Sequence, residues 1–327
     1  MARQTERIPL WSPAPGTRQE LVLHRYGQRG ARPKAYLQAS LHADETPAMM
    51  AVHHLLPHLE RADREGRIKG EIVILPYANP LGLAQVVNET LLGRYELRGG
   101  GNFNRNWPNL TVPLAARLEG RLTQDGAANV ALVRAAVLEV LDEIEPRKEL
   151  DVLRVILSRE SLTADLVLDL HCDDDSLAHW FTIPEQWPET QDIAAEIGVE
   201  AVLLAEDSGG GSFDEFNSLL WYRLRARFPG HPLPGACVSG TVEFRGQGDV
   251  SDELGAADGA ALYRMYHATE GFLAATSEWM QICVDLEARK SAPWDPQIRA
   301  KIDAVLARQA HLPRPAEVGR VMQVRGS

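Results

Sequence analysis

The chain has 327 residues, 45% of them hydrophobic, which is enough for one large core or two modest ones. Its formal net charge is −11, and no block of Lys or Arg offsets it, so we do not expect nucleic acid as a partner. No apolar run is long enough to cross a membrane, and the amino-terminal stretch MARQTERIPLWSPAPG lacks the apolar core of a signal peptide.

Short runs of apolar or β-branched residues predict strands. In chain order they are LVLHRY (21–26), AYLQASL (35–41), EIVILPY (71–77), DLVLDLH (165–171), AVLLAE (201–206) and TVEF (241–244). The third and fourth of these runs are apolar almost throughout. Such runs are typical of strands whose two faces are both covered by helices.

Helical patterns separate the predicted strands. Apolar residues recur at helical spacing in 126–146, 255–276 and 295–309. A further helix is expected to begin at Thr46-Pro47, with Thr46 as its cap and Pro47 in its first turn.

Another helix start is indicated by SFDE, because Ser212 followed by Glu215 is a capping-box signature. Since strands and helices alternate, we predict an α/β fold with a mixed, largely parallel central sheet and helices on both faces. The simplest organisation is a single catalytic domain over residues 1–327. Within it, residues 281–327 are expected to form a helical carboxyl-terminal extension, and no appended β domain is evident.

The stretch LHADETP places an imidazole and a carboxylate, His42 and Glu45, where a predicted strand gives way to a helix. In α/β sheets, ligands bind at the carboxyl ends of strands. A metal ion would explain this close pair of donors. The alternative is chance, because surface His and Glu are common.

A third donor, His171, ends the apolar run DLVLDLH, again at the carboxyl end of a predicted strand. Strand alternation puts Asp169 on the same face as His171 and Cys172 on the opposite face. Asp169 is therefore a candidate acceptor for the ring of a metal-bound His171. A Cys–His nucleophile pair is not expected. Two His and one Glu suit a catalytic Zn²⁺ site, in which the fourth position holds water.

Four motifs in this order resemble the succinylglutamate desuccinylase/aspartoacylase family of the zinc carboxypeptidase superfamily. They are HADE (42–45), NFNRNWP (102–108), LDLH (168–171) and TVEF (241–244), within a resemblance that spans roughly residues 20–280. The resemblance implies a zinc carboxypeptidase-like fold. It also implies that His42, Glu45 and His171 bind one zinc ion.

The same resemblance assigns roles to four further residues. It implies that Asn104 and Arg105 grip a substrate carboxylate, that Arg98 holds substrate or the developing oxyanion, and that Glu243 is the general base. A guanidinium suits the first role because it forms two parallel hydrogen bonds with a carboxylate. The alternative for Arg105 is that it is an ordinary surface arginine. The alternative for Glu243 is that it pairs with Arg245 at the strand end.

Three residues depart from the family pattern. Ala43 stands where Gly is usual, Asn102 where an Asp precedes the Asn-Arg pair, and Trp107 where Phe is usual. These changes leave the predicted metal ligands intact but leave the identity of the substrate open.

The predicted function is zinc-dependent hydrolysis of the amide bond of an N-acyl amino acid or a similar small carboxylate. One alternative is a metallocarboxypeptidase that releases carboxyl-terminal residues from peptides, and an ester substrate is also open. Another is a catalytically inactive binding protein on the same fold, although a binder has no need of a base at Glu243.

Two remaining features concern the rim and the compartment. The loop DSGGGS (207–212) either cradles an anion at a helix start or is simply a mobile rim loop. The widely spaced Cys172, Cys237 and Cys283 form neither a disulfide framework nor a Cys-based zinc site, so a cytoplasmic location is expected.

Overall fold

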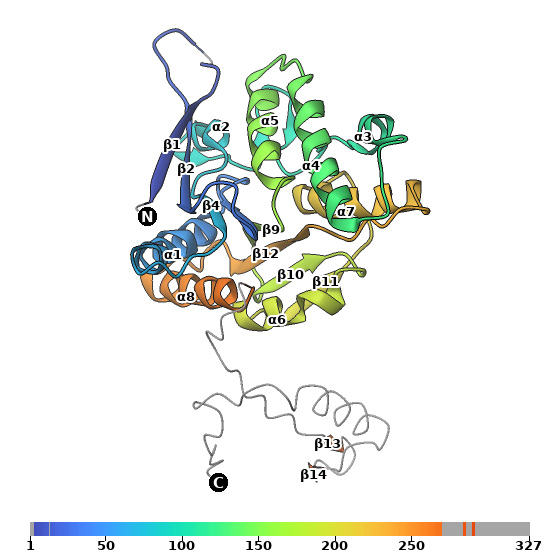
Figure 1. Ribbon diagram of the computed structural model, residues 1–327. Coiled ribbons are helices and arrows are strands. Elements are labelled where there is room, and N and C mark those ends of the chain that lie inside the picture. The colour runs from blue at the N-terminus through green and yellow to red at the C-terminus, as the bar shows by residue number, and fades with distance from the viewer. Residues whose placement is uncertain (1–2, 13, 270–283, 286–289, 292–327) are drawn as a thin grey trace. The chain divides into compact units, whose positions relative to one another are not determined.

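The computed structural model describes residues 3–12, 14–269, 284–285 and 290–291 (Figure 1). The chain divides into two units, residues 1–270 and 271–327. In the second unit, β13 (Val284–Asp285) and β14 (Lys290–Ser291) pair antiparallel. The helical extension predicted for residues 281–327, including the pattern at 295–309, otherwise lies outside the described residues and stays a prediction.

The first unit is built on an eight-stranded sheet with the order β1-β2-β4-β3-β9-β12-β10-β11. The central strands β4, β3, β9 and β12 are parallel, whereas β2 and β10 run antiparallel to them. The predicted mixed, largely parallel sheet is therefore confirmed. Its strands are β1 (Gln4–Pro9), β2 (Glu20–Gly27), β3 (Lys34–Ala39), β4 (Glu71–Leu75), β9 (Leu166–Asp173), β10 (His179–Thr182), β11 (Ala201–Leu204) and β12 (Val238–Gly246).

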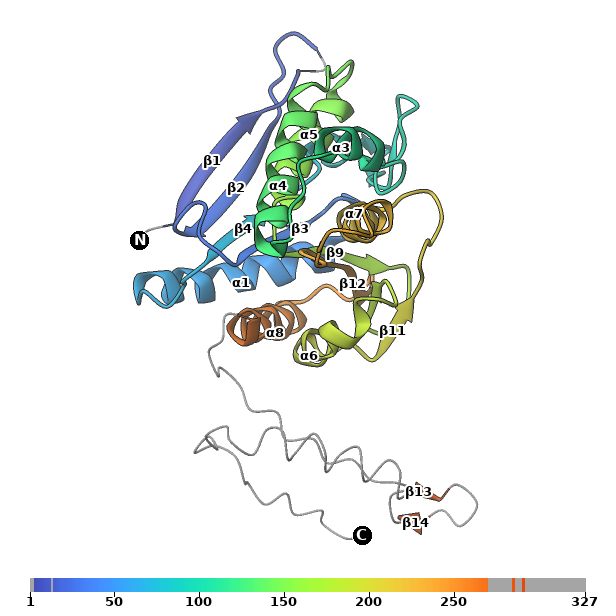
Figure 2. The same cartoon turned by 45° about the vertical axis from the view of Figure 1, so that its right-hand side comes forward.

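Helices cover both faces of this sheet (Figures 1 and 2), as predicted. They are α1 (Thr46–Arg64), α2 (Pro80–Leu83), α3 (Thr111–Leu118), α4 (Gly126–Asp142), α5 (Glu149–Ser161), α6 (Trp187–Ile197), α7 (Phe213–Arg227) and α8 (Asp252–Thr269). No helix among the described residues is both long and apolar enough to span a membrane.

Strand alternation divides the buried side chains between two cores. On β3, Tyr36 packs into the core formed with α3, α4, α5 and α7, whereas Leu37 packs into the core formed with α1, α6 and α8. The same alternation on β9 sends Val167 to the first core and Leu168 to the second. Apolar residues at successive strand positions are therefore buried on opposite faces, which explains the nearly continuous apolar runs.

A long connection between α2 and α3 carries two small hairpins. They are formed by β5 (Val86–Val87) with β6 (Thr90–Leu91) and by β7 (Tyr95–Glu96) with β8 (Gly101–Asn102). This connection reaches the carboxyl ends of the central strands, where the predicted ligands lie.

The two predicted helix starts are confirmed, but the predicted capping interactions are not. The N-cap of α1 is Glu45 rather than Thr46, and its side chain does not cap the helix because it bonds to histidines instead. Ser212 is the N-cap of α7, but its hydroxyl donates to Asp214 Oδ1 at 2.5 Å. Glu215 accepts from the backbone of Ser208, so the capping box predicted from SFDE is wrong.

Candidate metal and substrate site

The first two predicted ligands lie in the tight turn between β3 and α1. Ser40, with φ of 67°, turns the chain out of the sheet, and the Glu45 N–H donates to the His42 carbonyl at 3.2 Å. This turn places His42 Nδ1 2.8 Å from Glu45 Oε1. Both side chains are buried, and Glu45 is only 1% exposed.

The third predicted ligand approaches from β9, which pairs with β3. His171 Nδ1 lies 2.6 Å from Glu45 Oε2, and the His42 and His171 rings meet edge to face with centroids 4.8 Å apart. One donor atom from each of the three residues lies within 4.8 Å of the others. The structure therefore brings His42, Glu45 and His171 together around one point.

The outer nitrogen of each imidazole faces an oxygen acceptor. His42 Nε2 lies 2.8 Å from Asn102 Oδ1, which also accepts the Asn104 N–H, and His171 Nε2 lies 2.9 Å from Asp169 Oδ2. The Nδ1 atoms face the Glu45 carboxylate at hydrogen-bonding distance, so an Nδ1–H donates to it here, and a bound metal ion would take the place of these protons. This arrangement is compatible with a metal ion, because metal-bound imidazoles usually donate their other N–H to an acceptor.

Asp169 is itself held by neighbouring strand residues. Gln38, its partner in the β3–β9 pairing, donates from Nε2 to Asp169 Oδ1 at 2.9 Å. Gln38 Oε1 in turn accepts from the Tyr36 hydroxyl at 2.6 Å. Gln38 therefore fixes Oδ1 of Asp169, and this leaves Oδ2 directed at His171, 2.9 Å from its Nε2 atom.

Electrostatics reinforce this cluster. Burial alone would raise the pKa of Glu45, but His171 and His42 outweigh burial and hold it well below its usual range. Burial would lower the pKa of His171, but Asp169 and Glu45 raise it well above its usual range. Glu45 is therefore ionised at neutral pH, as a ligand must be.

Glu243 lies on β12 beside His171, its partner in the β9–β12 pairing. Burial, together with nearby carboxylates, raises the pKa of Glu243 to about 7. Its Oε2 atom is buried and has no hydrogen-bond partner among the described residues. The alternative pairing with Arg245 does not form, because Arg245 binds Asp258.

These groups open onto one cavity of about 190 Å³. It is lined by both histidines, Glu243, Asn104 and Arg105. The other lining residues are Arg94, Cys172, Asp173, Phe181, Thr182, Ile183, Ala205, Ser208, Ser212, Asp214, Glu215 and Thr241. Two of the three predicted metal ligands, the predicted base and the predicted carboxylate-binding residues thus share one cavity.

Arg98, in contrast, does not lie at this cavity. Its side chain is 62% exposed and pairs with Glu149 Oε1 at 3.1 Å, beside a separate cavity. Arg94 stands at the site instead, donating to Glu45 Oε1 at 2.9 Å. The placement of Arg98 at the site is wrong because β7 and the turn after it carry it outward.

Glycine explains how Arg94 reaches the metal-ligand turn. A Cβ on Gly93 would lie 2.3 Å from the Asp44 nitrogen, and the Gly93 carbonyl accepts the Ala43 N–H at 3.0 Å. Only a glycine permits this approach. Gly82 similarly leaves room for Ala43, since a Cβ there would lie 2.9 Å from the Ala43 Cβ. The glycine at position 93 was the feature of the sequence that could have indicated that Arg94 lies close to the turn carrying His42 and Glu45.

Asn104 and Arg105 lie side by side on the loop that follows β8. Asn104 Oδ1 accepts the Phe213 N–H at 2.8 Å and so ties this loop to the start of α7. Arg105 donates from Nη1 to the Asn104 carbonyl at 2.7 Å. The rest of the Arg105 guanidinium remains available at the cavity. The side-chain oxygen of Asn104, in contrast, is already used to bind the start of α7.

Residues 31–131 match the family described as the succinylglutamate desuccinylase/aspartoacylase catalytic domain. The predicted resemblance to this family is confirmed. A solved structure assigned to the family, from Shewanella amazonensis, is 25% identical and has a TM-score of 0.68 over 83% of this chain and 73% of its own. No curated protein sequence matches the chain.

Two more distant structures share the fold. A second structure assigned to the family, from Shewanella frigidimarina, is 22% identical with a TM-score of 0.72, covering 82% of this chain and 72% of its own. The product-bound ectoine utilization protein EutE (DoeB) from Ruegeria pomeroyi is 15% identical with a TM-score of 0.55, covering 85% and 70%. The family model covers residues 31–131, which include His42 and Glu45, and the buried His–Glu–His group is compatible with a metal ion.

Proposed function

We propose that this protein is a zinc-dependent hydrolase that cleaves the amide bond of an N-acyl amino acid or a similar small carboxylate. One observation carries the proposal. The two histidines of the His42–Glu45–His171 group, Glu243 with its unpaired Oε2 atom and Arg105 all border the same cavity. A metal site, a base and an anion anchor are the three parts that such a reaction needs.

His42 and His171, through Nδ1, and Glu45, through its carboxylate, would hold the ion. Two imidazoles and one carboxylate are a set that zinc accepts in catalytic sites. When bound, Zn²⁺ supplies Lewis-acid polarisation of the scissile carbonyl and lowers the pKa of the attacking water. Asp169 and Asn102 keep both rings in the orientation that this binding requires.

Glu243 is the proposed general base. Its carboxylate, beside the proposed metal ligand His171, takes a proton from the attacking water and passes it to the leaving nitrogen. A catalytically inactive binding protein would gain nothing from an unpaired, buried carboxylate. The unpaired Oε2 atom of Glu243 therefore favours an enzyme over a binder.

The substrate is held at two places. Arg105, with the free part of the Asn104 amide, anchors the carboxylate through charge-assisted hydrogen bonds. Arg94, which lines the cavity beside Glu45, takes the role first assigned to Arg98 and stabilises the developing oxyanion.

Carboxylates in the cavity wall restrict the rest of the substrate. Asp173, Asp214 and Glu215 line the cavity together with Glu243, and burial raises the pKa of Asp214 to about 6. A second carboxylate on the substrate would meet this negative wall. We therefore expect N-acyl amino acids with neutral or basic side chains to be better substrates than those with acidic side chains.

The test begins with protein purified without chelator, whose metal content is measured. The protein is then assayed with N-acetyl amino acids, their ester analogues and short peptides. We expect about one zinc per chain, amide hydrolysis that chelation abolishes, and recovery when zinc is returned. Hydrolysis of peptides alone would replace the deacylase with a carboxypeptidase, and absence of bound metal would overturn the mechanism.

A further inference from the structure

The substrate-anchoring loop is supported by a second loop more than a hundred residues away in sequence. The Asn106 N–H donates to the Gly210 carbonyl at 2.6 Å, and the Trp107 N–H donates to the Gly211 carbonyl at 3.1 Å. Asn106 has φ of 60°, a left-handed conformation that few non-glycine residues adopt. Backbone pairing with the 207–212 loop holds the chain in this conformation directly after Arg105.

Gly210 also touches the Arg105 side chain. A Cβ on Gly210 would lie 2.8 Å from Arg105 Cδ and 3.4 Å from Nε. The bare Cα of this glycine therefore forms the surface against which the aliphatic part of Arg105 lies. Any larger residue would push the guanidinium out of its present position.

On the other side, α5 supports the same loop through Arg154. Its Nη2 donates to the Arg105 carbonyl at 2.7 Å and its Nη1 to the Asn106 carbonyl at 3.4 Å. The guanidinium also lies 5.5 Å from the centre of the Trp107 ring. The two Nη atoms of Arg154 therefore serve the loop backbone, whereas its Nε has no hydrogen-bond partner among the described residues.

We propose that Gly210 and Arg154 are positioning residues that clamp Arg105 from two sides and so set how tightly the substrate carboxylate is bound. This inference rests on the proposed function, because it takes Arg105 as the carboxylate anchor. It gives the 207–212 loop a role as a support for the anchor, in place of the anion cradle or mobile rim weighed from the sequence. The clamp acts on carboxylate binding and not on the bond-breaking step.

The test compares Gly210→Ala with Gly209→Ala. Gly209 has φ of 88° and Gly210 has φ of 84°, so alanine strains the backbone alike at both sites. A Cβ on Gly209 meets nothing within 4 Å, whereas one on Gly210 meets Arg105. We expect Gly210→Ala to raise KM for an N-acetyl amino acid on the order of 10- to 100-fold, with kcat nearly unchanged. Gly209→Ala should change KM less than about twofold.

The same compounds with the carboxylate replaced by a neutral carboxamide provide a second arm. Because a carboxamide cannot use Arg105 as an ion, its kcat/KM should be nearly equal in both variants. Equal KM values for the two glycine variants, or an equal loss on the carboxamide, would overturn the clamp. Circular dichroism and Tm establish that both variants fold.

Arg154→Lys tests the other side without placing a side chain near the cavity. Lysine keeps the charge but lacks the fork that reaches both carbonyls, so KM should rise several-fold. Arg159→Lys on the same helix is the control, since the Arg159 guanidinium pairs with Asp142 at the surface and does not contact the loop. An Arg154→Lys enzyme with the KM of the Arg159→Lys control would remove Arg154 from the clamp.

Calorimetric binding separates this inference from the proposed function. N-acetyl amino acid binding is measured in the Glu243→Gln background, where turnover is not needed. Weaker binding with Gly210→Ala but not with Gly209→Ala supports the clamp even if the wild type hydrolyses none of the compounds, in which case only the proposed chemistry fails. Equal binding in both variants overturns the clamp even if hydrolysis is observed.

Discussion

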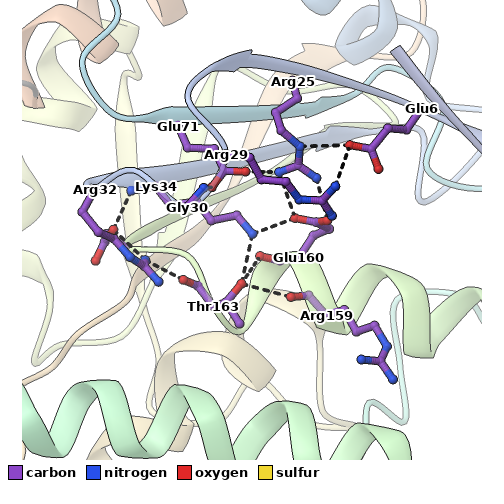
Figure 3. Close-up of polar contacts among 11 residues, drawn as sticks. Glu6, Arg25, Arg29, Gly30, Arg32, Lys34, Glu71, Arg159, Glu160 and Thr163 are labelled. Carbon is purple, nitrogen blue, oxygen red and sulfur yellow. Dashed lines mark hydrogen bonds and ion pairs between the residues drawn. The ribbon is translucent and has the colours of Figure 1, made fainter. Parts of the chain in front are cut away.

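Buried charges gather at both ends of the central strands, and the two groups differ in how completely they are paired. At the amino ends lies a network of Glu6, Arg25, Lys34, Glu71 and Glu160, which we call the amino-end network (Figure 3). At the carboxyl ends of β3, β9 and β12 lies the carboxyl-end site. Its members are His42, Glu45, His171 and Glu243.

In the amino-end network, every carboxylate faces a cation. Arg25, whose side chain is 1% exposed, binds Glu71, Glu160 at 2.9 Å and Glu6 at 3.1 Å, and Lys34 binds Glu160 at 2.6 Å. Burial works against the charge of Arg25, but Glu160 and Glu71 outweigh it and raise its pKa. Each charged group of the network pairs with another member, and Figure 3 shows the side chains pointing at one another.

The charged groups of the carboxyl-end site are only partly paired. Glu45 receives both imidazoles and Arg94, yet Glu243 keeps a buried oxygen without a partner among the described residues. An unpaired buried charge is costly unless a ligand or reaction uses it. The comparison teaches that paired buried charge maintains the fold, whereas unpaired buried charge beside a cavity indicates chemistry.

Among variants that distinguish the carboxyl-end site from the amino-end network, a change at Glu243 should have the largest effect. We expect Glu243→Gln to lower kcat by about 10²- to 10⁴-fold, because the amide cannot take the proton from water. Tm and metal content should remain those of the wild type, since Glu243 forms no ion pair with any residue that the structure describes. Steady-state kinetics with metal analysis checks this, and undiminished turnover would remove the base assignment.

Changing Arg25 should instead lower the stability of the protein and leave its catalysis unchanged. Arg25→Met leaves Glu71 and Glu160 buried without their cation, so we expect a loss of about 3–5 kcal/mol in the free energy of unfolding. Urea denaturation measures it, and kcat per folded molecule should stay nearly constant. Arg18→Met is the control, because Arg18 is 79% exposed and its pair with Glu20 spans 3.6 Å. Equal stabilities of the two variants would contradict the assigned role of the network.

Two arginines near the site provide the next comparison. Arg94→Ala should lower kcat on the order of 100-fold, as loss of one oxyanion donor does. Arg98→Ala should leave kcat/KM unchanged, because its guanidinium faces Glu149 and solvent. The reverse order would restore Arg98 to the site and refute the placement of Arg94.

The two ends of β9 can be compared directly through their aspartates. Asp169→Asn should weaken zinc affinity about 10- to 100-fold, because His171 loses its charged acceptor. Asp165→Asn, at the amino end beside Arg134 and Arg32, should leave zinc affinity unaltered. Competition with a fluorescent chelator measures both values.

The smallest expected effect is the pH dependence of the amino-end network. Burial would raise the pKa of Glu160, but Lys34 and Arg25 outweigh burial and lower it from its ordinary value of 4.5. A depressed folded-state pKa contributes stability above the unfolded pKa and loses it as the pH falls through the folded pKa. The stability difference between wild type and Glu160→Gln should therefore narrow as the pH falls below about 4.5. Urea titrations at several pH values check this, and a constant difference would contradict it.

Local patterns in the sequence predicted much of the fold. All six predicted strands are present, and the helical pattern at 126–146 matches α4. The exposed edge strand β1 and the short β10 were missed, because neither has a long apolar pattern. The helices α2, α3, α5 and α6 were missed as well, as were the two-residue strands β5 to β8, so recognition was most complete for the strands of the central sheet.

The amino-acid sequence by itself determined the metal-ligand candidates, because His42, Glu45 and His171 stand at strand ends that any parallel sheet brings to one edge. Only the tertiary structure decided that Arg94 rather than Arg98 meets Glu45 and that Asn104 supports α7. The physical reason is range. Strand ends follow from local periodicity, whereas these contacts depend on close backbone approaches between segments far apart in the chain, which no local pattern encodes.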